Sequence, residues 1–316
     1  MRRHSARLFT VFEERAGWRS GRLTAVDVAD RQAAHEGAAM SFPQIQDFRD
    51  ECEALAQVLE PLDDAAFEQP TLFKGWTLHD VIAHLHIFNW AADASIHDPE
   101  RFDRWWGDLQ RTIAGGKNLR EATDDWLGAE RNRAAFERWR SFYPGMCDRL
   151  EGVDSKLRVQ WAGPPMSARS SVTARQMETW AHGQEVWDVL GLDREDTDRI
   201  KNVAVLGVNT FGWTYRVRGR EVPAETPYVR LEAPSGAIWE WNDPASENRV
   251  EGTATELCQV VTQVRNVADT ELRTTGPVAT EWMSIAQCFA GPPETPPAPG
   301  TRHRARTPPA WAKHLV

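Results

Sequence analysis

Apolar and polar residues alternate with a helical period through the first two thirds of the chain. In residues 42–60 the apolar positions fall on one face of a helix, and the same holds for residues 77–92. Residues 118–151 carry a longer, highly charged pattern with the same period. Residues 171–190 stop at Gly191, a residue typical of a helix C-terminus. The chain is therefore predicted to begin with a set of long helices.

The pattern changes after one more expected helix at 197–214. Residues 228–233 and 237–241 alternate residue by residue, and Pro-Ser-Gly at 234–236 separates them, as in a hairpin of two strands. Three shorter elements follow: a helix at 255–264, a strand at 272–275 and a last helix at 278–289. The predicted fold class is mainly α, with a four-helix bundle followed by a small α+β domain.

Four segments are expected along the chain. Residues 1–40 have weak periodicity and are predicted to be a disordered extension, with Met40 as a second candidate start. Residues 41–195 form the helical bundle and 196–290 the α+β domain. Residues 291–316 hold seven of the 19 prolines together with several arginines, a composition that predicts a disordered tail.

Composition narrows the class of protein. A net charge of −9 argues against nucleic acid as the main partner. No apolar run approaches the roughly 20 residues that cross a membrane, and no apolar leader follows the first residues. The four cysteines lie far apart, which is typical of reduced thiols in a cytoplasmic protein. The expected form is a monomer or homodimer that takes a small-molecule substrate.

Glu178 and His182 are the first candidates for chemistry. Residues four apart share one face of a helix, so both side chains can bind one ion. A third ligand would come from the histidines near residue 80, and helical projection favours His84, at the edge of the apolar stripe, over His79 and His86. Two ligands from one helix and one from another are a common way to build a metal site in a bundle.

Spacing alone leaves this interpretation open. A Glu-x-x-x-His pair on a helix is more often a solvated surface pair, and a single histidine on a bundle face is more often a core residue. Glu185 shares the face of His182 and could orient its imidazole or compete as a ligand.

Two sequence blocks carry a family resemblance. Residues 70–85 read PTLFKGWTLHDVIAHL, which resembles the P-T-x-x-x-G-W-T-x-x-D-x-x-x-H-L signature of mycothiol-dependent maleylpyruvate isomerase-like proteins, metal-binding members of the DinB-like superfamily. Residues 163–184 resemble the second block of an actinobacterial-type branch of that group. The resemblance extends over about 41–293, with further matches at 205–213, 260–265 and 289–293.

The resemblance implies a divalent metal, usually zinc, held by His84, Glu178 and His182. Iron, nickel or manganese also suits such a donor set. The resemblance further implies a low-molecular-weight thiol such as mycothiol as cosubstrate. By a weak match, it also assigns to Arg265 the binding of a substrate carboxylate.

The expected function is a metal- and thiol-dependent isomerase or S-transferase acting on a small carboxylate or electrophilic substrate. Three protein ligands leave zinc an open position, as in catalytic sites. Two alternatives stay open: a non-catalytic module that binds a ligand or a protein, and a zinc-water hydrolase with Glu185 as general base. A sealed metal position would favour the first alternative.

Overall fold

The computed structural model describes residues 41–307. The extension predicted for residues 1–40 and the last part of the predicted tail, 308–316, lie outside the described residues. The described chain forms two compact units, each made of two stretches of sequence. Unit 1 comprises residues 41–49 and Ile82–Val172, and unit 2 comprises Asp50–Val81 and residues 173–307. The division into domains at residue 195 stays a prediction.

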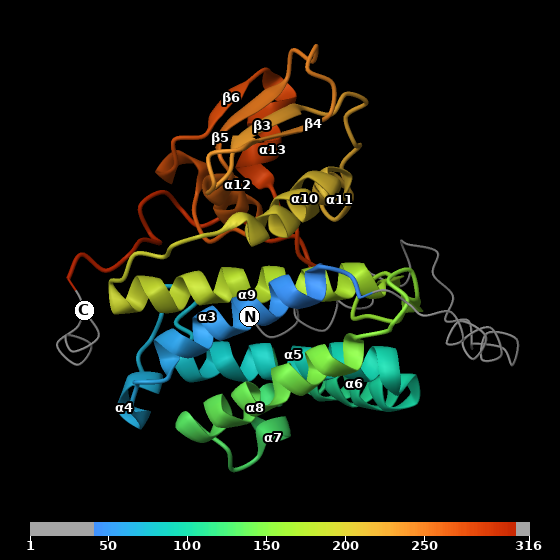
Figure 1. The fold of residues 1–316 in the computed structure, drawn as a ribbon, viewed down its shortest axis with the longest axis vertical. Helices are drawn as coiled ribbons and strands as arrows, with labels where there is room; N and C mark the ends of the chain where they lie inside the picture. Colours follow the sequence, from blue (N-terminus) through green and yellow to red (C-terminus); the bar gives the residue numbers. More distant parts are fainter. Residues whose placement is uncertain (1–40, 308–316) are drawn as a thin grey trace, which may run out of the picture. The chain divides into compact units, whose positions relative to one another are not determined.

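Three long helices each contain a boundary between the stretches assigned to unit 1 and unit 2: α3 (Gln44–Leu59), α5 (Leu78–His97) and α9 (Ala168–Leu190) (Figure 1). On α3 the side chains of Phe48, Cys52, Leu55 and Leu59 are fully buried, as their spacing of three and four residues predicts. Helix α8 (Arg133–Leu150) is a further long helix.

Unit 1 contains two further helices, α6 (Pro99–Ala114) and α7 (Leu119–Leu127), and a short hairpin. Helix α6 begins with Asp98, whose side chain accepts a hydrogen bond from the Arg101 backbone N–H, and with Pro99 in its first turn. Helix α7 begins with a capping box between Asn118 and Glu121. Strands β1 (Arg158–Val159) and β2 (Met166–Ser167) pair antiparallel just before α9.

The sequence pattern of 118–151 predicts one long helix, and this prediction is wrong. The chain breaks between α7 and α8, where Gly128 and Asn132 both adopt positive φ angles of 71° and 52°. Such angles are incompatible with a continuing right-handed helix. Helix α6 was not predicted from the sequence.

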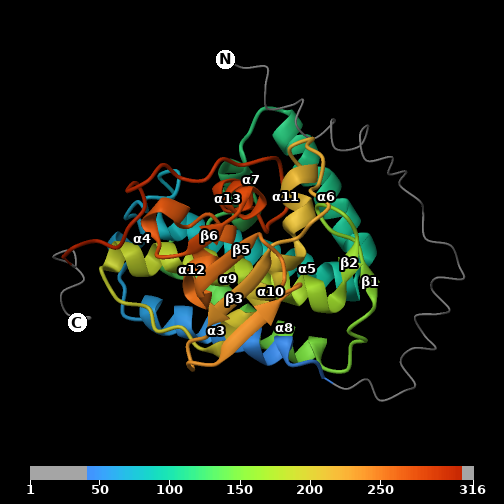
Figure 2. The ribbon, with the colours of Figure 1, turned by 90° about the horizontal axis from the view of Figure 1, so that it is seen from above.

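Unit 2 carries the sheet. The strands β3 (Tyr228–Glu232) and β4 (Ile238–Trp241) form the predicted hairpin, which turns at Gly236 with φ of 83°. The next strand, β5 (Arg249–Thr253), returns parallel to β3, and β6 (Arg273–Thr275) pairs antiparallel with β5. The order is thus β4-β3-β5-β6, and Figure 2 shows β3, β5 and β6 side by side. Strand β5 was not predicted.

Helices complete the core of unit 2. The expected helix at 197–214 is a short 3₁₀ turn, Asp198–Ile200, followed by α10 (Lys201–Asn209) and α11 (Phe211–Arg216). Helix α12 (Ala254–Val261) packs against α10 and β5, and α13 (Pro277–Ile285) packs against α11 and β6. Residues Met177, Trp180 and Ala181 of α9 belong to the same buried cluster. This cluster fixes the rotation of α9, because it holds one face of the helix.

The C-terminal segment 291–307 differs from the predicted tail. It has no regular secondary structure, yet several polar groups bind it to the rest of unit 2. The Ala305 backbone N–H donates to the Asp188 carbonyl at 2.8 Å, and the Gly300 N–H donates to the Asp269 carboxylate at 2.9 Å. Proline-rich composition predicted disorder because such a segment buries little apolar surface, whereas here side chains of unit 2 satisfy its backbone.

The predicted fold class is confirmed: the described chain is mainly α-helical, with one small four-stranded sheet. No helix within 41–307 combines the length and the apolar character that crossing a membrane requires.

Candidate functional site

The predicted pair on α9 is brought together in the structure. The His182 Nε2 atom lies 3.5 Å from Glu178 Oε2, and Arg175, one turn before, places its Nη2 atom 3.8 Å from Glu178 Oε1. His182 is 8% exposed, and Arg175 is buried at 3%. The pair is therefore not the solvated surface pair that its spacing could also have indicated.

Glu185 lies on the other side of the same imidazole. The His182 Nδ1 atom is 3.2 Å from Glu185 Oε2, and the Glu185 side chain is buried. A hydrogen bond from Nδ1–H to a carboxylate fixes the tautomer, so that Nε2 carries the lone pair. The structure places Glu185 as the residue that can orient His182.

The loop of residues 70–77 has a defined conformation. A tight turn spans 73–76, where Trp76 N–H donates to the Phe73 carbonyl at 2.8 Å. Its central residues, Lys74 and Gly75, have φ angles of 52° and 69°. Gly75 adopts its angle without strain because it lacks a Cβ, whereas Lys74 takes a left-handed conformation that residues with a Cβ rarely adopt. The Thr71 N–H closes the loop on the Trp76 carbonyl at 2.6 Å.

The loop ends in the capping box that its Thr-x-x-Asp sequence predicts. Asp80 Oδ2 accepts from the Thr77 backbone N–H at 2.8 Å, and the Asp80 N–H donates back to Thr77 Oγ1 at 3.2 Å. The cap starts α5 at a fixed residue, which sets the position of every later side chain on that helix.

Two aromatic rings of this loop pack on His182. The Trp76 ring is stacked on the imidazole with 5.6 Å between centroids and 5° between planes. The Phe73 ring meets it edge-on at 5.2 Å. These contacts restrict the imidazole to one orientation, so the Phe-Lys-Gly-Trp sequence acts on the site through its rings. The spacing of these residues in the sequence does not indicate this role.

Charge at His182 favours a cation. Burial opposes the protonated imidazole, but the Glu185 and Glu178 carboxylates outweigh it and raise the pKa of His182 to about 9. A divalent ion in place of that proton would bring two positive charges to the same carboxylates. The carboxylates and the imidazole thus form a donor set of the kind that zinc, iron or manganese accepts.

His84 lies on α5 in a half-buried position. Its ring contacts Phe88 with 4.8 Å between centroids, and Phe88 in turn contacts Trp105 at 6.0 Å and Trp161 at 6.2 Å. Any group bound at His84 would therefore have aromatic neighbours.

Two further histidines of α5 are buried. His79 is 1% exposed and His86 is 2% exposed. His86 contacts the rings of Trp126 and Phe142, with centroids 5.4 and 5.3 Å away. His86 therefore faces aromatic side chains of unit 1 rather than solvent.

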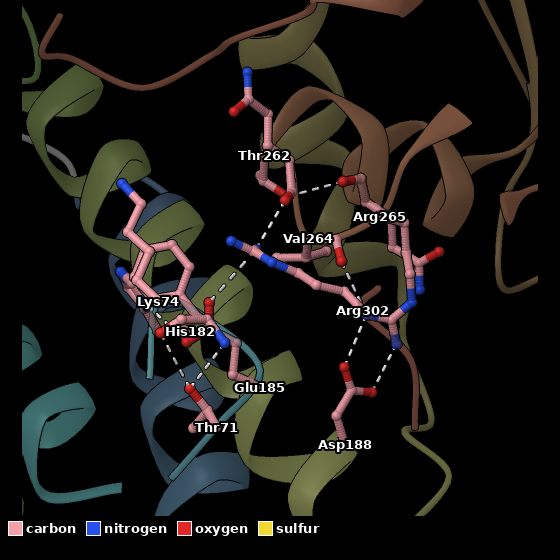
Figure 3. A network of polar contacts seen from close by, with 12 residues as sticks. Thr71, Lys74, His182, Glu185, Asp188, Thr262, Val264, Arg265 and Arg302 are labelled. Carbon is pink, nitrogen blue, oxygen red and sulfur yellow. Dashed lines mark hydrogen bonds and ion pairs between the residues drawn. The ribbon is translucent and has the colours of Figure 1, made fainter. Parts of the chain in front are cut away.

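Arg265 follows α12 and is held by an acidic partner. Its Nη1 and Nη2 atoms donate to the two oxygens of Asp188 at 2.8 and 2.6 Å (Figure 3). A substrate carboxylate, the partner predicted for Arg265, would have to replace this two-point ion pair.

A second arginine, which was not predicted from the sequence, lies beside Glu185. Arg302, in the segment predicted to be a disordered tail, carries its guanidinium over the Phe73 ring at 4.6 Å and places Nη1 4.0 Å from Glu185 Oε1. Figure 3 shows this side chain reaching toward Glu185. No periodic pattern or motif signals such a residue, because only the tertiary path of the segment puts it there.

Comparison with known proteins places the chain in a family. The model of the mycothiol maleylpyruvate isomerase N-terminal domain matches residues 48–187. Two proteins of Mycobacterium tuberculosis strains, both described as uncharacterized, are each 35% identical over 254 residues, which cover 79% of this chain and 96% of theirs. The chain belongs to the mycothiol-dependent maleylpyruvate isomerase-like family.

Two solved structures are similar to the chain over part of its length. The crystal structure of the mycothiol-dependent maleylpyruvate isomerase is 17% identical, with a TM-score of 0.43, and the match covers 69% of this chain and 86% of that one. A mutant of that enzyme matches with 16% identity and a TM-score of 0.44.

Proposed function

We propose that this chain is a divalent-metal-dependent enzyme of the thiol-dependent isomerase or S-transferase type, with His84, Glu178 and His182 as metal ligands. Its substrate would be a small carboxylate or electrophile, and its cosubstrate a low-molecular-weight thiol such as mycothiol. Membership of the isomerase-like family supports the thiol and the reaction class. Cytoplasmic location and a monomeric or dimeric state stay predictions.

The metal site is proposed because donor atoms of three residues lie close together. One ligand atom from each of His84, Glu178 and His182 can be chosen so that all three lie within 4.8 Å of one another. Ligands about 2.0–2.2 Å from a shared zinc ion lie within such a distance of each other. Two imidazoles and one carboxylate are also the donor set of open, catalytic zinc sites.

The chemistry follows from the ion and from the residues around it. A bound zinc ion lowers the pKa of a thiol or water that reaches its open position. Glu185 would hold His182 through Nδ1, and Trp76 would keep the imidazole from rotating. Phe88 and the rings beside it would exclude water from a substrate near His84.

Metal content tests the proposal directly. The full-length protein, purified without an affinity tag, should hold about one equivalent of a divalent ion by mass spectrometry, and His84→Ala and His182→Ala should each fall below about 0.1 equivalent, because two ligands rarely retain zinc. His303→Ala, an exposed histidine, is the matched control. Metal that is absent from the wild type, or unaffected in both ligand variants, would leave the non-catalytic binding module as the better description.

A second measurement separates the reaction classes. The metal-loaded protein should consume a thiol and an activated electrophile together if it is a transferase. It should instead require the thiol without consuming it if it is an isomerase. Turnover of an ester without any thiol would favour the hydrolase.

A further inference from the structure

The last described segment, residues 291–307, which we call the strap, is fastened to unit 2 by a buried glutamine. Gln263, which is 5% exposed, donates from its side chain to the Glu294 carbonyl at 3.3 Å. The Gln263 carbonyl in turn accepts a hydrogen bond from Arg302 Nη1 at 2.9 Å. One residue of the core thus fixes two points of the strap that are far apart along it.

The same two strap residues also contact the loop of residues 70–77. Glu294 Oε1 accepts a hydrogen bond from Lys74 Nζ at 3.0 Å, and the Arg302 guanidinium lies over the Phe73 ring, 4.6 Å from its centroid. Lys74 and Phe73 are adjacent residues in the turn of the loop. The loop and the strap both belong to unit 2. The strap therefore connects the turn to the core of that unit.

The turn itself is poorly buried. Leu72 is 51% exposed, and the Lys74 side chain is 52% exposed. Lys74 also has a φ angle of 52°, in the left-handed region that residues with a Cβ rarely adopt. A strained and exposed turn opens easily unless contacts from elsewhere hold it. The strap supplies such contacts at Lys74 and at the residue before it.

The position of the turn is transmitted to His182 through aromatic rings. The Phe73 ring meets the imidazole edge-on, with 5.2 Å between centroids, and the Trp76 ring stacks on it at 5.6 Å. Phe73 and Trp76 also contact each other, with 5.0 Å between centroids. Phe73 thus touches both the guanidinium of the strap and the imidazole of the candidate site. A shift of the turn would move both rings that restrict the imidazole.

Arg302 has a second neighbour, Glu185, through which it could act instead. The distance from Arg302 Nη1 to Glu185 Oε1 is 4.0 Å, which exceeds that of a hydrogen bond. The guanidinium lies well within the roughly 6 Å at which a cation and an aromatic ring attract each other. Its side chain is only 13% exposed, and loss of water strengthens this attraction. The contact with Phe73 is therefore the one that geometry favours.

We propose that Glu294 and Arg302 are positioning residues. Through them the strap holds the loop of residues 70–77 on His182 and fixes the imidazole in the orientation in which its Nε2 atom can bind the metal. Neither residue would touch the ion or the substrate. This inference rests on the proposed function for the ion. It deepens that function by making metal affinity depend on a segment that lies far from His182 in the sequence.

Hydrogen exchange of the loop tests the strap without any metal. In the metal-free, full-length protein, Arg302→Met should speed amide exchange in residues 70–77 by about threefold to thirtyfold, because the cation over the ring is lost. Glu294→Gln should speed it by about twofold to fivefold, since the ion pair with Lys74 is exposed. Arg304→Gln is the matched control, because Arg304 belongs to the strap but pairs with Asp193.

The exchange experiment has two outcomes that overturn the proposal. One is unchanged exchange of the loop in Arg302→Met. The other is faster exchange in every peptide of unit 2 together with earlier thermal unfolding, because Arg302 would then support the fold as a whole. The proposal holds if the increase is confined to residues 70–77.

Zinc affinity, measured by competition with a chromophoric chelator, tests the effect on the site. Arg302→Met should bind zinc about threefold to tenfold more weakly than the wild type, and Arg302→Lys, which keeps a cation over the ring, should lose less. Phe73→Leu should weaken binding at least as much as Arg302→Met. The double variant Phe73→Leu/Arg302→Met should then match Phe73→Leu alone, because two residues that act through one contact are not additive.

The double variant separates the two routes from Arg302. If Arg302→Met weakens zinc binding as much in the Phe73→Leu background as in the wild type, Arg302 acts through Glu185, and the proposal is wrong. Equal zinc affinity in Arg302→Met and the wild type overturns it as well. A wild-type protein that binds no zinc contradicts the proposed function instead, and hydrogen exchange of the loop then still decides whether the strap holds it.

Discussion

Two buried histidines, one in each unit, show how differently the same side chain is used. His86 of unit 1 is 2% exposed and lies among the rings of Trp126 and Phe142. Burial, with a smaller effect from Arg138, lowers the pKa of His86 to about 3. His182 of unit 2 is 8% exposed and also touches aromatic rings, yet its pKa is raised to about 9.

Burial and aromatic contact therefore do not decide the charge of a histidine in this protein. Both groups lose water, which by itself favours the neutral form. What differs is the presence of carboxylates: Glu178 and Glu185 lie 3.5 and 3.2 Å from the nitrogens of His182, whereas neither nitrogen of His86 has a hydrogen-bond partner within residues 41–307. A cation is favoured at one histidine and excluded at the other.

The largest expected effect comes from removing both carboxylates. In metal-free Glu178→Gln/Glu185→Gln, only burial remains, so the pKa of His182 should fall from about 9 to below its ordinary 6.5. NMR titration of the imidazole resonances measures this change, and the pKa of His86 should not move. A double variant in which His182 still titrates near 9 would show that another group charges it.

The single change Glu185→Gln should weaken metal binding rather than abolish it. A residue that orients a ligand histidine typically contributes about tenfold to a hundredfold in metal affinity. Competition with a chromophoric chelator gives the affinity, and Glu195→Gln, which alters an exposed glutamate on the following loop, serves as control. Unchanged affinity in Glu185→Gln would mean that its contact with His182 has no bearing on the metal.

The smallest expected effect is the loss of folding stability that His86 causes at acidic pH. Its folded pKa, about 3, lies below the unfolded value of 6.5, so the unfolded chain binds the extra proton and stability falls as pH drops below 6.5. Between pH 7 and pH 5 this group should cost about 2 kcal/mol of the free energy of unfolding. Urea unfolding at both pH values should show a loss smaller by that amount in His86→Leu.

His303→Gln, a change at an exposed histidine, controls for the loss of one titratable ring. If His86→Leu and His303→Gln lose the same stability between pH 7 and pH 5 as the wild type, His86 is not neutral in the folded protein, and the contrast with His182 disappears.

Part of the fold and of the candidate site could be predicted from local sequence. The apolar period located α3, α5 and α9, and Thr77 with Asp80 predicted the cap that starts α5. Helical spacing alone put Glu178, His182 and Glu185 on one face of α9, where the structure places them in contact. The hairpin of β3 and β4 was likewise visible, since a strand alternates with period two and Gly236 marks its turn. All of these depend on interactions within a few residues of each other.

Contacts between residues far apart in the sequence were decided only by the tertiary structure. Arg265 forms its ion pair with Asp188. Arg302 lies about 120 residues after His182, belongs to no motif, and has its guanidinium over the Phe73 ring. It also decided which histidine is charged, because the pKa depends on the groups that surround a buried ring and not on the ring's neighbours in sequence. Periodicity determines which face of a helix is apolar. What meets that face, and with which charge, depends on long-range packing that a local pattern does not contain.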